Sequence, residues 1–152
     1  MGLFDAIDVA GSGLSAERLR MDVTSENLAN AQTTKGADGQ PYRRKTVVLA
    51  EAGGQGSFGS ALNAAMTRSV GSAGSPARGV QVTGIVADSS PLKRIYDPGH
   101  PDADANGYVT MPNVNTVTEM TDLISASRAY EADVTAMQTA KQMFIKTLDI
   151  LR

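Results

Sequence analysis

A repeating pattern of mostly apolar residues at each end of the chain is the feature that most restricts its fold. Near the N-terminus the pattern recurs alternately every four and every three positions, at Leu3, Ile7, Ala10, Leu14, Glu17, Met21, Thr24, Leu28 and Ala31. Near the C-terminus the same spacing runs through Met120, Leu123, Ser127, Tyr130, Val134, Met137, Lys141, Phe144, Leu148 and Leu151. Such spacing places the residues along one face of a helix. The chain is therefore predicted to begin and end with a long amphipathic helix.

The N-terminal arm, residues 1–34, is predicted to end its helix near Asn30. Asn30 and the following Thr33 are typical of a helix stop followed by a turn. Gly11 and Gly13 lie within the helical pattern, where small residues allow another helix to approach closely. They match a loose dinucleotide-binding pattern, but that interpretation requires a strand before the glycines. We therefore assign them a packing role.

The C-terminal helix is predicted within residues 115–152. Thr116 and Glu119 have the spacing of a capping box, in which both side chains satisfy free backbone N–H groups. Pro112 prevents an earlier start. Lys141 falls within the apolar stripe, and its long side chain is expected to reach the edge of the stripe and solvent.

The two helices need partners, because neither can bury its apolar face alone. The simplest partner for each is the other, which predicts a coiled-coil-like pair formed by the two ends of the chain. Two helices still make a thin core, so apolar surface is left for contact with other molecules.

The middle of the chain, residues 35–114, is predicted to be β-rich, which makes the fold class α+β. Four short runs favour strands in a small antiparallel sheet or two hairpins: 46–50, 80–87, 92–96 and 108–111. Between the first two runs, residues 51–79 are rich in Gly, Ala and Ser, and we expect a flexible loop there.

Composition excludes several classes of function. The 152 residues include no cysteine and one histidine, His100. Disulfides, thiol catalysis and cysteine-ligated metals are therefore excluded. A single histidine also disfavours a catalytic metal site built on histidine ligands. The formal net charge is −2, which indicates neither a nucleic-acid partner nor an anionic membrane surface. We expect a protein that is not an enzyme and has no cofactor.

Membrane insertion and a secretory signal are also not expected. No run of about 18 consecutive apolar residues is present, so no segment is predicted to span a bilayer. Asp5 and Asp8 interrupt the first ten residues, where a cleaved signal requires a basic and then an apolar run.

An Asp-rich segment offers an alternative function. Asp102, Asp104, Asn106 and Gly107 match the first half of a calcium-binding loop, whose oxygen ligands stand at alternate positions before a glycine turn. The bidentate Glu expected further along is Asn113. A tight Asp-rich turn is the preferred interpretation, and a small soluble calcium- or ligand-binding module remains the alternative.

Several stretches resemble the bacterial flagellar rod and hook proteins. The segment Ser25-Glu26-Asn27-Leu28-Ala29-Asn30-Ala31-Gln32-Thr33 resembles the N-terminal signature of that family, and residues 119–132 resemble its C-terminal helix. Gly39-Gln40-Pro41-Tyr42-Arg43, Ser90-Pro91, residues 96–104, Gly107-Tyr108-Val109 and Met111-Pro112-Asn113-Val114 are similar to the proximal rod members of the family. The resemblance covers nearly the whole chain except residues 51–79, which look longer than the usual connection.

The resemblance implies a structural subunit of the proximal rod within the periplasm. Such a subunit leaves the cytoplasm through the flagellar export apparatus without a cleaved signal and assembles helically with itself and other rod proteins. It transmits torque, and its terminal helices border the export channel. Assembly would then depend on the signature residues Asn27, Asn30 and Thr33 and on the apolar positions Leu14, Met21, Leu28, Tyr130, Val134, Met137, Phe144 and Leu148.

Overall fold

The computed structural model describes residues 3–36, 38–52 and 78–150. Most of the segment expected to be a flexible loop, and Leu151 of the C-terminal stripe, lie outside the described residues. The elements in chain order are α1 (Leu3–Ala29), β1 (Lys45–Glu51), β2 (Val80–Ala87), β3 (Lys93–Tyr96), β4 (Tyr108–Met111) and α3 (Thr116–Ile150).

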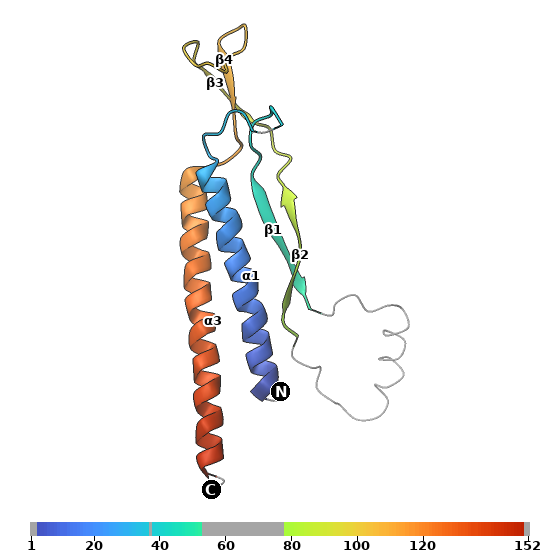
Figure 1. Ribbon diagram of the computed structural model, residues 1–152, viewed down its shortest axis with the longest axis vertical. Helices are drawn as coiled ribbons and strands as arrows, with labels where there is room; N and C mark the ends of the chain where they lie inside the picture. Colours follow the sequence, from blue (N-terminus) through green and yellow to red (C-terminus); the bar gives the residue numbers. More distant parts are fainter. Residues whose placement is uncertain (1–2, 37, 53–77, 151–152) are drawn as a thin grey trace, which may run out of the picture.

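These elements form a long, narrow molecule in which α1 lies between α3 and the β1–β2 hairpin (Figure 1). The two helices are antiparallel, so both ends of the chain lie at the same end of the molecule, and α3 extends beyond the start of α1. The β3–β4 hairpin projects past the opposite end of the helix pair. The predicted α+β fold with a terminal helix pair is confirmed.

Both sheets are two-stranded and antiparallel, and they lie at the predicted runs. In the first, Lys45 lies opposite Ala87 and Glu51 opposite Val80, with a register shift beside Val48. In the second, β3 and β4 pair over four residues each. A two-stranded sheet is marginal alone, so β1 and β2 depend on α1, against which they pack.

A tight turn after β2 sends the chain from the first hairpin to the second. The Asp88 carboxylate accepts hydrogen bonds from the hydroxyl and the backbone N–H of Ser90, at 2.6 and 2.8 Å. These bonds lower the pKa of Asp88 below its usual value. Arg43 donates to the backbone oxygens of Asp88 and Ser90, which ties the turn to the segment before β1.

The Asp-rich segment forms the connection between β3 and β4. Gly107 has a φ of 76°, and its N–H donates to the Asp104 carbonyl at 2.7 Å. A Cβ at Gly107 would lie 2.9 Å from the ring of Tyr96, so only glycine fits this turn. The glycine is thus explained by backbone conformation and by contact with an aromatic ring.

The core is thin, as expected for a two-helix pair. In the described part of the chain, the buried aliphatic residues are Ala16, Val23, Val109, Val114 and Ala126, and Pro112 is buried beside them in the sequence segment that leads into α3. The close approach expected from the glycines of α1 is present, since a Cβ built on Gly13 would lie 2.7 Å from a carboxylate oxygen of Asp133.

The face that α3 turns toward α1 differs in part from the predicted stripe. Glu119 and Ala126 are 1% and 0% exposed, whereas Met120, the first residue of the stripe, is 51% exposed. The innermost row is therefore one position earlier, about 100° around the helix. Small and hydrogen-bonded side chains let the helices approach more closely there than large apolar ones would.

The predicted capping box at the start of α3 is wrong. Asn115 caps the helix, because its side-chain oxygen accepts the Val117 N–H at 3.1 Å and its carbonyl accepts the Glu119 N–H at 3.0 Å. The Glu119 side chain points into the protein and bonds elsewhere.

Candidate assembly site

Asn27, in the N-terminal signature, is 1% exposed and uses its whole hydrogen-bonding capacity. Its Nδ2 donates to the Lys45 carbonyl at 2.8 Å and to Glu119 Oε2 at 3.0 Å. Its Oδ1 accepts the Tyr42 hydroxyl and the Lys45 N–H, both at 2.9 Å. An amide has two donor hydrogens and two acceptor lone pairs, so all four are satisfied. One side chain thus joins α1 to β1 and to α3.

Glu119 is the second buried member of this cluster. Its other oxygen accepts from Arg44 Nε at 2.5 Å, and Arg44 Nη2 lies 3.3 Å from Asp122. The hydrogen bond to Glu119 is the main cause of the raised pKa of Arg44. A buried carboxylate is tolerated when it is paired and hydrogen-bonded. We call Asn27, Tyr42, Arg44, Lys45, Glu119 and Asp122 the polar clamp.

Tyr42 and Lys45 complete the clamp on its α1 side. Burial, followed by the nearby charges of Glu26 and Glu119, raises the pKa of Tyr42 to about 12. Lys45 pairs with Glu26 at 2.5 Å and lies over the Tyr42 ring at 5.5 Å. The tyrosine therefore stays neutral and keeps donating its hydrogen bond to Asn27.

The end of α1 is held by the other signature residues. Asn30 Nδ2 donates to the Glu26 carbonyl at 2.9 Å, and the Thr33 hydroxyl donates to Asn30 Oδ1 at 3.2 Å. The Thr33 N–H donates to the Asn30 carbonyl at 3.1 Å. The Asn30 carbonyl, which the helix end would otherwise leave free, is thereby satisfied. The two asparagines therefore make different contacts. Asn27 joins α1 to other elements, whereas among the described residues Asn30 bonds only within the end of α1 and the turn that follows it.

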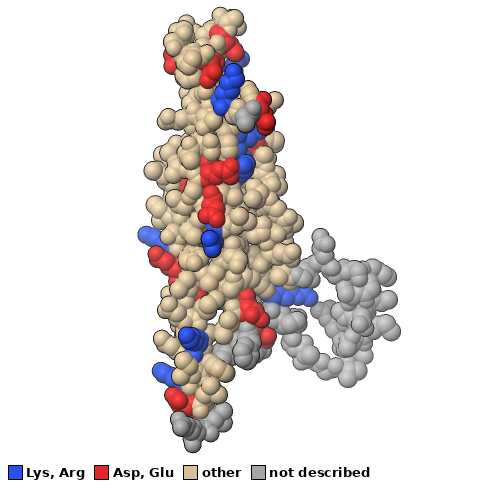
Figure 2. Space-filling view, in the orientation of Figure 1, with Lys and Arg blue, Asp and Glu red and all other residues tan. Residues whose placement is uncertain are grey.

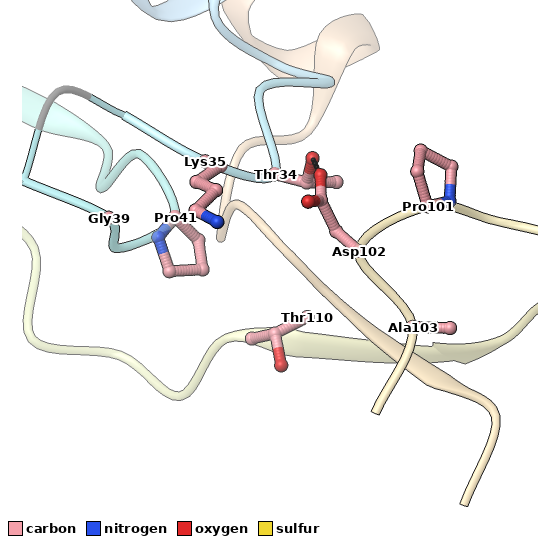
Figure 3. A pocket seen from close by; sticks show the side chains of 8 residues that line it. All are labelled: Thr34, Lys35, Gly39, Pro41, Pro101, Asp102, Ala103 and Thr110. Atoms are coloured by element: carbon pink, nitrogen blue, oxygen red, sulfur yellow. Dashed lines mark hydrogen bonds between the residues drawn. The ribbon is translucent and has the colours of Figure 1, made fainter. Parts of the chain in front are cut away.

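A hollow of about 310 Å³ lies where the chain after α1 meets the Asp-rich connection (Figure 3). The Thr34 hydroxyl donates to Asp102 Oδ2 at 2.7 Å, and Lys35 lies beside Pro41. Asp104 instead pairs with Arg94 at 3.2 Å. The structure thus turns the two carboxylates toward different partners, and nowhere in the described ranges do three potential ligands gather to hold a metal ion. The calcium-binding alternative gains no support.

The apolar positions expected in assembly differ in exposure along the helices. Leu14, Met21, Leu28, Tyr130, Val134 and Met137 are half-buried, while Phe144 and Leu148 are 38% and 51% exposed. The face of the molecule in Figure 2 is mostly uncharged, with charged side chains in small separate groups. Apolar side chains near the two ends of α3 are therefore within reach of a neighbouring molecule.

Sequence reasoning did not find most of the polar clamp. It identified Asn27, but treated Glu119 as a cap and gave no role to Arg44 or Asp122. One signal was present: Glu119 stands seven residues before Ala126 and therefore on the same helix face. A second signal was the basic run Arg43-Arg44-Lys45 at the start of a predicted strand, which offers cations to pair with a buried carboxylate.

The site can hold elements together, but the contacts described give it no catalytic arrangement. Its groups are committed to one another through hydrogen bonds and ion pairs, and this is typical of a structural network. None of the helices in the described ranges is long and apolar enough to cross a bilayer.

Comparison with known proteins gives the class of protein. Residues 7–37 match the family "Flagella basal body rod protein", and residues 105–150 match the family "Flagellar basal body rod FlgEFG protein C-terminal". The two matches coincide with the helix pair and with the helical members of the polar clamp. The fold and site are therefore those of an axial protein of the bacterial flagellum.

Full-length relatives narrow the class to one family. The chain is 49% identical to the flagellar basal-body rod protein FlgC of Bacillus subtilis and 46% identical to that of Borreliella burgdorferi. It is 42% identical to that of Salmonella typhimurium, and each comparison covers at least 98% of both chains. The chain belongs to the FlgC family. It is a non-enzymatic structural subunit of the proximal rod, in the part of the flagellar basal body that spans the periplasm.

Proposed function

We propose that the chain polymerises with copies of itself and with other axial proteins through its helix pair, whose helices pack lengthwise around the export channel. The observation that supports this is an imbalance in the described residues. Five alanine and valine side chains are buried, whereas fifteen large apolar side chains are exposed, seven of them on α3 and eight on the strands. Exposed apolar surface of this extent is typical of an interface.

The contacts between subunits are heterologous in this proposal: one surface meets a different surface on the next molecule. Repeating such a contact produces an open helical assembly and not a closed ring. Torque then passes through many such interfaces. The arm of residues 1–34 and the helix of residues 115–152 form the inner layer. The middle, residues 35–114, lies outside and contacts neighbouring subunits.

The chain reaches the rod, in this proposal, through the flagellar export apparatus and without a cleaved signal. The marginal core supports this route, because a chain that buries few apolar residues unfolds at little cost. The lack of cysteine in the sequence also supports it, since an exported chain without thiols cannot mispair in an oxidising compartment.

Deletion of the gene in its host, followed by electron microscopy of purified basal bodies, tests the proposal. We expect membrane rings without a rod in non-motile cells, and rescue by the intact gene. A matched pair of variants tests the helix pair: Val134→Asp, which charges a half-buried position, and Thr135→Asp, which charges an exposed one. Complete rods with Val134→Asp would show that this face is not an interface.

A further inference from the structure

A groove runs along α1 between α3 and the β1–β2 hairpin. Its floor is α1, which contributes mostly small residues, Ala6, Ala10, Gly13 and Ala16, together with Val9 and Glu17. One wall is α3, through Ala129, Asp133 and Ala136, and the other is the hairpin side, through Leu49, Val80 and Arg78. The groove has a volume of about 680 Å³. A mostly apolar groove with a floor of mainly small side chains is suited to receive the side chains of another helix.

One carboxylate of this groove, that of Asp133, has no partner among the residues that the structure describes. Asp133, on the α3 wall, is half-buried and stands over Gly13. Within the described ranges it makes no hydrogen bond and no ion pair. Glu17, also in the groove, is only 15% exposed at its side chain and pairs with Arg20 at 3.2 Å. Arg78, on the hairpin side of the groove, pairs with Glu51 at 3.7 Å. The groove is therefore mostly apolar, and Asp133 places a negative charge on its α3 wall.

The end of α3 has the complementary chemistry. Met143, Ile145 and Leu148 are 60%, 48% and 51% exposed and point in different directions around the helix. Lys141 and Lys146 are exposed, and neither makes a hydrogen bond or ion pair with any described residue. Exposed apolar side chains beside lysines on one helix end are suited to contact with an apolar surface that carries a negative charge.

The groove and the end of α3 cannot meet within one molecule. The continuous helix from Ala136 to Leu148 separates them by about 18 Å, at a rise of about 1.5 Å per residue. The helix carries its end away from the groove and past the start of α1 (Figure 1). The end of α3 can therefore fill a groove only on another molecule.

We propose that the end of α3 of one copy docks into the groove of a second copy, with a lysine of that end facing Asp133. The two surfaces differ, so each docked copy leaves one groove and one helix end free, and the contact repeats without closing. This inference rests on the proposed function and names the surfaces through which two copies meet.

Cysteine cross-linking tests the contact directly, because the chain has no cysteine of its own. Purified full-length Leu148→Cys is mixed with Ala136→Cys and oxidised at high protein concentration. We expect a cross-linked dimer in that mixture. The matched control is Thr135→Cys, one residue from Ala136 but exposed about 100° away around α3. Equal dimer yields from the test and control mixtures would overturn the proposal.

Charge reversal tests the role of Asp133. In the Ala136→Cys background, Asp133→Lys should lower the dimer yield roughly tenfold, the effect of about 1.4 kcal/mol of lost attraction. Reversing both lysines of the Leu148→Cys chain, Lys141→Glu and Lys146→Glu, should restore it. A yield that does not respond to either change would refute the charge pairing.

Two further measurements test whether something other than a second copy fills the groove, either the chain's own residues or a different rod protein. Maleimide labelling of Ala136→Cys should be fast in dilute protein, and slow labelling there would show that the chain already covers its own groove. Cross-linking in purified basal bodies should join two copies of this chain, and a product with a different rod protein would overturn the choice of a second copy. Rods that assemble without the Leu148–Ala136 link would refute this inference while leaving the proposed function intact.

Discussion

Replacing Asn27 by aspartate removes both donor hydrogens from the centre of the polar clamp and changes almost nothing in shape. One oxygen of the new carboxylate can still accept from Tyr42 and the Lys45 N–H. The other would face two acceptors, the Lys45 carbonyl and Glu119 Oε2, which lie 2.8 and 3.0 Å from the native Nδ2. The native Asn27 and Glu119 are each 1% exposed, so water does not screen the new pair of charges.

The size of the effect follows from that geometry. Two like charges 3.0 Å apart repel by about 5 kcal/mol at an effective dielectric constant of about 20. Two lost hydrogen bonds add about 1 kcal/mol each. Arg44, bonded to the other oxygen of Glu119, offsets part of the repulsion. We expect Asn27→Asp to lower the free energy of unfolding by about 3–5 kcal/mol at neutral pH.

Urea unfolding of the purified full-length chain, followed by far-ultraviolet circular dichroism, measures this difference. The matched control is Asn30→Asp, which loses the bond that Asn30 Nδ2 donates to the Glu26 carbonyl within the same helix. The control should lose about 1 kcal/mol or less. The deficit of Asn27→Asp should also shrink as the pH falls toward about 4, because protonating one carboxylate removes the repulsion.

Equal stability of the two variants, or a deficit independent of pH, would refute the reasoning. Tyr42→Phe provides a milder test where Asn27→Asp does not fold. It removes one bond to Asn27 Oδ1, which still accepts the Lys45 N–H. We expect a loss of about 1 kcal/mol for that change.

Three more predictions concern the titration of Tyr42, the last turns of α3 and the face around Val134. Because burial raises the pKa of Tyr42 from 10.0 to about 12, its neutral form is favoured by folding. The stability that it contributes is present below about pH 10 and is lost as the pH rises through about 12, so urea midpoints should fall less steeply there in Tyr42→Phe than in the native chain. Amide exchange of the free protein should be slower in the first turns of α3 than in its last turns, which extend past α1; uniform protection along α3 would contradict this. Val134→Asp should abolish motility, with synthesis intact on immunoblots, while Thr135→Asp swims; equal swimming would place Val134 outside any interface.

Local sequence was sufficient to predict which segments become helix and strand. Apolar spacing predicted both helices, since a period near 3.5 sustained over about thirty residues is rarely produced by anything but a helix. Prolines, glycines and β-rich runs predicted the four strands of the described chain to within one residue at each end. These outcomes depend on local backbone preferences, which neighbouring residues determine.

The side of α3 that faces α1, and the role of Glu119, depend instead on tertiary structure. Periodicity locates an apolar stripe, but it does not predict that Glu119 is buried while Met120 is exposed. Burial of Glu119 is possible only because its carboxylate bonds to Arg44 and Asn27. Those residues lie 75 and 92 positions away in the chain. Asp133 is a similar case, since its place over Gly13 exists only after the helices pair. Polar interactions over such distances are created by folding, so they become visible only when the elements have been brought together.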